Sequence, residues 1–351
     1  MSGNISTRFS RKVTTVSLIL SIAVMYIHAK NLAYYDFGDA LGTPIYVLNQ
    51  IFSETFGRVA VPFFFLQSGY WLFRYDIYEK NSGNLKRKLK KKVKSLVIPY
   101  LLWNTLGLLY YVIVSHISSL LMRINDGQVV DITWNNIFKG IVFHEFYLSS
   151  WFMQDLIVLT ALSPVFVLLL RKQYVTYVTI VTFMILSILG IDTPVCQTSS
   201  LLLFIMGGTL SVYHREYWEN PNRNYWETIV YVVIFLVGAA IRWLSIPYLS
   251  TFFIAVSPIL FWKCCDFLGT INVFDHEPFW FCKQSFFIYC AHMIPVQAMS
   301  SILSRINNTM AWSCFSYIIT PPVVLVLLYV AARILSKRLP IMYSLLCGNR
   351  A

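Results

Sequence analysis

Apolar runs of about 18–25 residues recur along the whole chain, and short polar segments separate them. A run of this length crosses a bilayer as a helix, whereas the strands of a membrane barrel alternate over about ten residues. The pattern therefore predicts an all-α, polytopic membrane protein. We expect about ten transmembrane helices, at roughly 13–34, 51–73, 95–117, 151–170, 174–190, 199–213, 228–245, 249–268, 284–304 and 315–335. The sixth is short and holds Gly207–Gly208, so we expect it to be tilted, broken or closely packed.

Composition agrees with this pattern and leaves no room for a soluble domain. Hydrophobic residues make up 57% of the 351 residues, and charged residues make up 13%. A typical soluble protein has about 25% charged residues. No polar segment is long enough to fold by itself, so we expect residues 1–351 to form a single membrane-embedded domain. The seven Cys residues include no CxxC pair, so the sequence predicts no metal site.

Basic residues are distributed unevenly between the segments that join the predicted helices. If the N-terminus lies inside the cell, 22 of the 28 Lys and Arg residues fall on the inner side. Because inner loops carry the excess of positive charge, this count predicts that both termini are cytoplasmic and that the number of spans is even. The net charge of +12 then reflects topology and contact with anionic lipid, and it does not indicate a nucleic-acid partner.

Two ionisable residues lie at a similar depth in the first two predicted spans. At a rise of 1.5 Å per residue, His28 and Arg58 lie about 7 Å and 6 Å to the outer side of their helix midpoints. Ionisable side chains at this depth are costly and by default mark a functional site. A guanidinium disfavours protonation of a nearby imidazole and so keeps it available as a base. The structural alternative is that Arg58 pairs with carbonyls or with Glu54, and that His28 bonds a neighbouring helix.

Other polar residues extend this pair into a polar track through the predicted bundle. Glu54 begins the second predicted span and Asp155 lies near the start of the fourth, so either could orient His28. His292 lies deep in the ninth span among apolar residues and could line a substrate path. Gln67–Ser68 lies in the inner half of the second span. The alternative for Asp155 is simple solvation at the membrane interface.

The segment 85–94, LKRKLKKKVK, is strongly basic and has Leu or Val at every fourth position. This spacing predicts one apolar face of an interfacial helix that leads into the third span. One interpretation is a lipid anchor. The other is a site for a polyanionic cytoplasmic ligand, such as the phosphates of coenzyme A. The residues expected to bind such a donor are Arg87, Lys88, Lys91 and Lys92.

Five segments, in order along nearly the whole chain, resemble acyltransferase family 3, a family of integral-membrane O-acyltransferases. They are AVMYIHAKN, RVAVPFFFLQSGYWLF, KSLVIPYLLWN with its basic lead, SSWFMQDLI and FFIYCAHMIPV. One position departs from the family pattern. The family usually has Arg eleven residues before the first His, and Ser17 stands there in this chain.

The resemblance implies transfer of an acyl group, most often acetyl, from cytoplasmic acyl-CoA to a hydroxyl of a cell-envelope carbohydrate or related acceptor. It implies acyl-CoA as a substrate, no bound cofactor, and a multi-pass protein of the bacterial cytoplasmic membrane. A hydroxyl is a poor nucleophile until a base removes its proton, and His is the usual base near neutral pH. We therefore expect His28 to act as this base, and Arg58 to hold the developing oxyanion or an acidic group of the donor.

Two other classes of function are consistent with the sequence. A secondary transporter or lipid-linked glycan exporter would also use intramembrane charges and a discontinuous helix, although the chain shows no inverted repeat. Its function would depend on an ion gradient rather than on acyl-CoA. A non-catalytic membrane scaffold would lose only stability on replacement of His28 by Ala. The sequence leaves the acceptor, the acyl chain length and the oligomeric state open.

Overall fold

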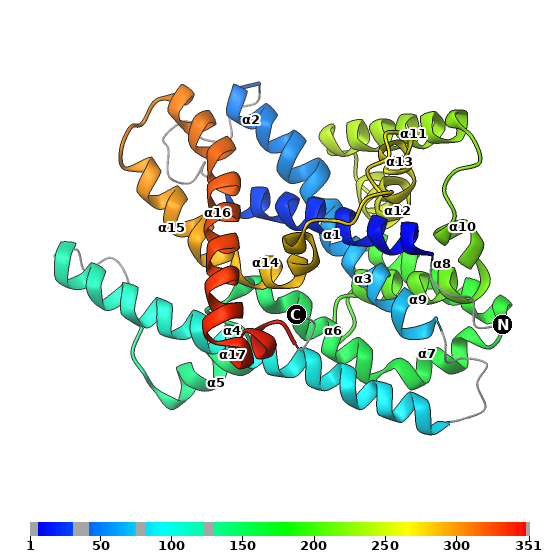
Figure 1. Ribbon diagram of the computed structural model, residues 1–351, viewed down its shortest axis with the longest axis horizontal. Coiled ribbons are helices and arrows are strands. Elements are labelled where there is room, and N and C mark those ends of the chain that lie inside the picture. The colour runs from blue at the N-terminus through cyan, green and yellow to red at the C-terminus, as the bar shows by residue number, and fades with distance from the viewer. Residues whose placement is uncertain (1–5, 31–41, 75–81, 123–129, 349–351) are drawn as a thin grey trace.

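The structure is a computed structural model that describes residues 6–30, 42–74, 82–122 and 130–348, with the backbone alone for 82–88 and 118–122. Within these ranges the chain is helical and contains no strand (Figure 1). The first α-helices are α1 (Thr7–His28), α2 (Pro44–Asn49), α3 (Arg58–Phe73), α4 (Ser82–Met122), α5 (Trp134–Val142), α6 (Trp151–Ala161), α7 (Ser163–Leu170), α8 (Gln173–Ile188) and α9 (Thr198–Tyr213). They are followed by α10 (Arg215–Glu219), α11 (Tyr225–Trp243), α12 (Leu249–Cys264), α13 (Asp266–Thr270), α14 (Ser285–Ala291), α15 (Met293–Ser304), α16 (Met310–Arg338) and α17 (Pro340–Leu346). A π-helix, η2 (Gln50–Gly57), joins α2 to α3, and 3₁₀ turns lie at η3 (Leu148–Ser150) and η4 (Trp280–Gln284).

Five of the described helical segments are long and apolar enough to cross a membrane: α1, α4, α11, α12 with α13, and α16. Two helix pairs raise this number to seven if each pair is one bent span. The α6–α7 pair is bent by 60° and the α14–α15 pair by 69°, while α8 and α9 are shorter apolar helices. For the described residues, the prediction of a helical fold with several helices able to span a membrane is confirmed. The number of ten spans and the cytoplasmic termini stay predictions.

Several helix boundaries differ from the predicted ones, for local reasons. The first helix begins at Thr7, before the apolar run, because the Ser6 hydroxyl accepts a hydrogen bond from the Phe9 N–H and so caps the helix. It ends at His28, and residues 31–34 of the predicted span lie outside the described residues. The basic segment is continuous with the third span in α4. The short helices α5, α10 and α17 fall in segments that the apolar pattern left as loops.

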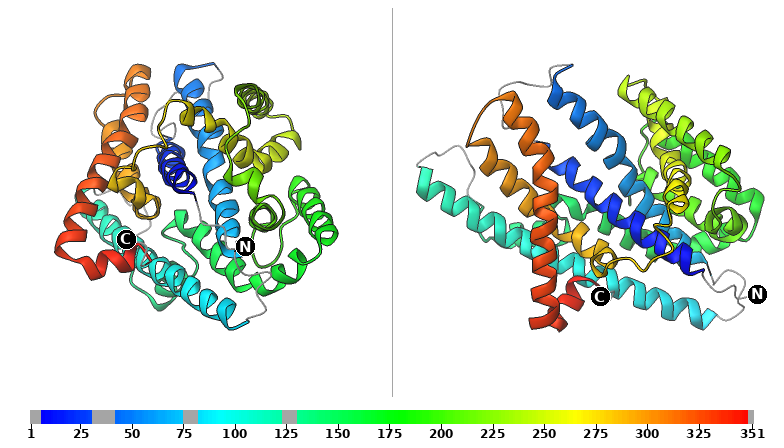
Figure 2. Two further views of the ribbon diagram at one scale, coloured as in Figure 1. Left: turned by 45° about the vertical axis from the view of Figure 1, so that its right-hand side comes forward. Right: turned by 45° about the horizontal axis from the view of Figure 1, so that its top comes forward.

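The central helix of the bundle is α1, which is seen almost end-on in the left view of Figure 2, with other helices around it. It contacts α3, α14, α15 and α16. Near its N-terminal end, Lys12 forms a 2.6 Å ion pair with Asp266, and both side chains are buried. At α3's C-terminal end Arg74 forms a 2.8 Å ion pair with Glu219. These pairs join segments that the charge pattern predicts on the inner side, and His28 lies at the other end of α1.

The tightest helix contact in the bundle joins α3 to α9 through two glycines. A Cβ on Gly69 would lie 2.0 Å from the backbone oxygen of Phe204. A Cβ on Gly207 would lie 1.9 Å from the backbone oxygen of Leu66. No side chain fits at either position, so the two backbones touch directly, as small residues allow in membrane bundles. The helix at the position of the predicted sixth span, α9, is therefore closely packed and unbroken.

Replacing Gly207 by Ala is expected to lower the free energy of unfolding by about 1–3 kcal/mol, because the new methyl group meets backbone atoms that cannot rotate away. Gly208→Ala is the matched control, since its Cβ would meet the side-chain carbons of Leu170 and Phe73, which can adjust. Thermal unfolding of the purified protein in detergent measures both variants. Equal losses would contradict direct backbone contact between the two helices.

Candidate active site

A cavity of about 400 Å³ contains both His28 and Arg58, and we call it the His28 cavity. His28 ends α1 and Arg58 begins α3, so two neighbouring helices bring the residues together, as their common depth predicted. Residues of η3, α6, α8, α9, α12 and α14 complete the wall, with Gln197 at the start of α9. Its other polar side chains are Ser149, Trp151, Ser187, Gln197, Ser199, Thr251 and Tyr289. The cavity thus combines an imidazole and a guanidinium with a mixed apolar and hydroxyl-bearing surface.

His28 is partly buried, and its ring makes no hydrogen bond to any other residue that the structure describes. It lies beside His292, with 5.1 Å between the ring centroids. His292 follows α14 at the 69° bend and is fully buried. Its Nδ1 lies 2.6 Å from the backbone oxygen of Tyr289, which can only accept, so Nδ1 donates in this bond. His292 packs beside the His28 ring and is not among the residues that line the cavity.

The carboxylate of Glu54 is paired with three cations, one of which is Arg58 of the His28 cavity. It lies in the π-helical turn η2 and pairs with Lys30, with Arg242 at 2.5 Å and with Arg58 at 3.2 Å. Arg242 also donates to the Glu54 backbone oxygen, at 2.8 Å. We predicted that Glu54 could orient His28. The structure instead directs this carboxylate to Arg58 and its cationic neighbours, so it fixes the guanidinium and makes no described bond to the imidazole.

Asp155 has a capping role in the structure. Its carboxylate accepts a hydrogen bond from the Ser200 hydroxyl at 2.7 Å and one from the Gln197 N–H at 3.3 Å. Ser200 lies in the first turn of α9 and Gln197 directly precedes this helix, whose N-terminal dipole favours a negative charge. The carboxylate therefore ties α6 to the start of α9. It positions Gln197 on the cavity wall, and it makes no described contact with His28.

A second cavity, of about 270 Å³, lies further along α3, and we call it the Gln67 cavity. Its polar lining comes from four segments: Ser17 of α1, Gln67 and Ser68 of α3, Lys92 of α4 and Ser285 of α14. Of the four basic residues predicted to bind a donor, Lys92 reaches this cavity and Lys91 is exposed. The side chains of Arg87 and Lys88 lie outside the described residues. Ser17, where the resembled family has Arg, therefore shares a cavity with a cation from another helix.

One helix, α3, serves both cavities because positions three and four apart share a helical face. The face toward the His28 cavity carries Arg58, Val61, Pro62 and Phe65. The face toward the Gln67 cavity carries Phe64, Gln67, Ser68 and Trp71. Arg58 and Gln67 are about 14 Å apart along the helix axis. The residues of these two faces can be read from the sequence once the bounds of α3 are known. The mean hydropathy of the segment is apolar and does not reveal them.

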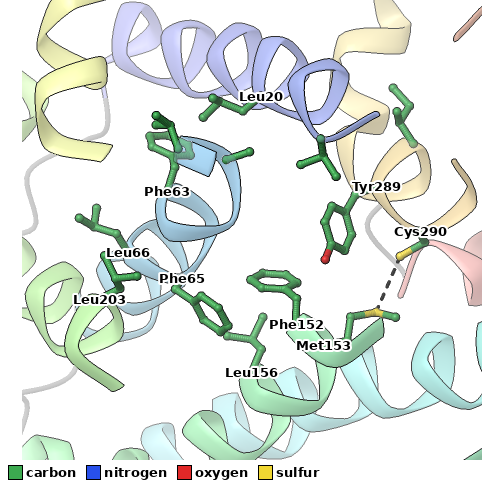
Figure 3. Packing of buried hydrophobic residues seen from close by; sticks show 14 of the residues in the cluster. Leu20, Phe63, Phe65, Leu66, Phe152, Met153, Leu156, Leu203, Tyr289 and Cys290 are labelled. Atoms are coloured by element: carbon green, nitrogen blue, oxygen red, sulfur yellow. Dashed lines mark hydrogen bonds between the residues drawn. The ribbon is translucent and has the colours of Figure 1, made fainter. Parts of the chain in front are cut away.

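Tyr289 lines both cavities. It is buried, and its hydroxyl donates to the Ser149 backbone oxygen at 3.0 Å. Its ring packs edge-on against Phe152, with centroids 5.2 Å apart, and Figure 3 shows it pointing from α14 toward that residue. A single aromatic side chain therefore forms part of the wall between the two cavities. Tyr289 lies three residues before His292, in the segment FFIYCAHMIPV that carries part of the family resemblance, but its sequence position does not indicate this role.

Comparison with known proteins gives one match. A family model described as an acyltransferase domain, Acyl_transf_3, matches residues 18–336. No curated protein and no solved structure matches the chain. The matched residues include both cavities and all of their described polar side chains except Ser17. Within the ranges that the structure describes, no three His, Cys, Asp or Glu residues are grouped to hold a metal ion.

Glu54→Gln is expected to lower the free energy of unfolding by about 2 kcal/mol, because it leaves three clustered cations without their shared carboxylate. High salt should restore part of this loss by screening the repulsion. The control is Glu277→Gln, whose exposed pair with Lys283 should contribute nothing measurable. Thermal unfolding at low and high ionic strength measures both. A salt-independent loss, or none, would contradict this role of Glu54.

Proposed function

Because the chain belongs to the acyltransferase 3 family, we propose that it is a membrane O-acyltransferase. The donor is acyl-CoA, acetyl-CoA in the simplest case, and the acceptor is a hydroxyl of a cell-envelope carbohydrate or a related molecule. One observation carries the proposal. His28 and Arg58 line one cavity, and Tyr289 separates it from a second cavity that holds Lys92. An acceptor in the first and a donor in the second would meet at this wall.

In the proposed reaction, the Nε2 or Nδ1 lone pair of His28 takes the proton of the acceptor hydroxyl. The acceptor oxygen then attacks the thioester carbonyl carbon, and the carbonyl oxygen becomes an oxyanion. Collapse of this intermediate breaks the carbon–sulfur bond. The leaving thiolate takes the proton from the His28 imidazolium, so the base is regenerated and no further reactant is needed. The products are an ester and free CoA.

Arg58 is suited to hold the oxyanion because Glu54 fixes it in place. The carboxylate accepts from Nε at 3.2 Å and from Nη2 at 3.5 Å. A guanidinium has five N–H donors, so these two bonds orient it and still leave Nη1 to face developing negative charge. His292 packs against the base and is proposed to hold its ring orientation.

The donor is proposed to approach from the side of the basic segment. Lys92 lies on the wall of the Gln67 cavity, and the acyl end of a donor placed there would point toward Tyr289. With the cytoplasmic side predicted by the distribution of basic residues, the acyl group would move outward to the level of His28. Movement of the Tyr289 ring would join the two cavities during transfer.

The proposal is tested in cells that express wild-type protein, His28→Ala or His276→Ala at matched membrane abundance. His276 is the control, because it is exposed and lines neither described cavity. Mass spectrometry measures ester-linked acetate on envelope glycans. We expect the ester with wild type and His276→Ala, and at least about a hundredfold less with His28→Ala. Full transfer by His28→Ala would remove His28 as the base.

The alternative function is a secondary transporter or lipid-linked glycan exporter. The bent helix pairs α6–α7 and α14–α15 are consistent with it, because transporters use interrupted helices at their binding sites. It predicts no difference in any ester between the variants. It also predicts flux that depends on an ion gradient and not on acyl-CoA. A membrane scaffold predicts that His28→Ala changes stability alone.

A further inference from the structure

Gln67 is a buried amide that has no hydrogen-bond partner among the residues that the structure describes. The residue is 7% exposed, and neither Nε2 nor Oε1 is paired within that part of the chain. A buried amide that gives up water without gaining a partner destabilises the fold, so such groups are rare and call for a specific explanation. A Leu at this position of α3 would match its apolar neighbours Phe65 and Leu66. The amide is therefore held ready for something that the cavity receives.

The surroundings of the amide define what would bind there. Three hydroxyls, from Ser17, Ser68 and Ser285, share the cavity with Gln67, and Lys92 is its one charged lining residue. The remaining wall is apolar or aromatic, from Phe64, Trp71, Phe152, Leu156, Phe286 and Tyr289. A ligand that fits this lining is narrow and neutral along most of its length, has amide groups, and carries negative charge at one end.

We propose that Gln67 binds an amide of the pantetheine arm of the acyl-CoA donor, an inference that rests on the proposed function. The side-chain oxygen of Gln67 accepts from an N–H of the arm, and its NH₂ donates to a C=O of the arm. This arm is neutral, contains two amides, and joins the phosphates to the thioester. Its phosphate end lies at Lys92, and its thioester end lies at Tyr289, next to the His28 cavity. Gln67 thereby sets which thioesters the enzyme accepts.

The first test compares donors. Steady-state transfer by purified protein in detergent is measured with acetyl-CoA, with S-acetylpantetheine, and with S-ethyl thioacetate, which has no amide. Gln67→Leu is expected to raise KM for the first two donors about tenfold, the effect of one or two lost hydrogen bonds. KM for S-ethyl thioacetate should stay unchanged. An unchanged KM for acetyl-CoA, or an equal rise with all three donors, would overturn the inference.

The second test separates binding from folding. Without ligand, Gln67→Leu is expected to have a higher Tm than wild type, because it removes an unpaired buried amide. Pantetheine should raise the Tm of wild type and fail to raise that of Gln67→Leu at the same concentration. The matched control is Gln284→Leu, whose buried amide oxygen already accepts a hydrogen bond from the Tyr343 hydroxyl at 2.8 Å. It should lower the Tm and keep the pantetheine shift.

The outcomes distinguish this inference from the proposed function. If wild type transfers acetyl but pantetheine binding does not depend on Gln67, the amide pairs with water or another ligand and the inference fails alone. If pantetheine binding requires Gln67 but no thioester is consumed by wild type, the transfer reaction fails and the binding site stands. If pantetheine does not raise the Tm of wild type, the inference is wrong.

Discussion

The contact on which the rest of the structure depends is the backbone-to-backbone packing of α3 against α9. Gly69 and Gly207 let each helix approach the backbone of the other, within a distance that no Cβ would permit. This face of α3 is thereby fixed in rotation and in depth. Successive residues of a helix are 100° apart around its axis. Fixing the face of α3 toward α9 therefore also fixes its faces toward the two cavities. One of them turns Arg58 into the His28 cavity, and the other turns Gln67 and Ser68 into the second cavity.

Several charged groups that join the helices of this bundle are paired within the protein. Lys12 with Asp266, Glu54 with its three cations, and Asp155 with the start of α9 are each paired within the protein. Such pairing is what a low-dielectric interior requires of a charge that only holds helices together. The amide of Gln67 and Nε2 of His292 are buried and have no hydrogen-bond partner within the described ranges, and the His28 ring faces a cavity. In the proposed account, substrate groups supply the bonds that Gln67 and His28 lack.

The sequence allowed prediction of the helical class and of the pair His28 and Arg58, because both follow from local pattern and depth along a helix. It also allowed prediction of the pair of Glu54 with Arg58, which lie one helical turn apart. It did not reveal the contacts of Glu54 with Arg242 or of Asp155 with Ser200, since these join distant segments. The bends before His292 and after Ala161 were hidden because both halves of each pair are apolar. The role of Tyr289 was not predicted for a similar reason. An aromatic residue in an apolar run is recognised as part of the wall between two cavities only when the fold is known.

In the proposed reaction the two cavities are consecutive parts of one path, with the donor in the Gln67 cavity and its acyl end at Tyr289. The most direct measurement is a cryo-electron microscopy structure of the protein with a thioether analogue of acetyl-CoA that cannot release its acyl group. The account predicts density for the pantetheine arm between Lys92 and Tyr289, with an amide within hydrogen-bond distance of Gln67. Density for the donor outside this cavity, or entering from the side of Glu54, would contradict it.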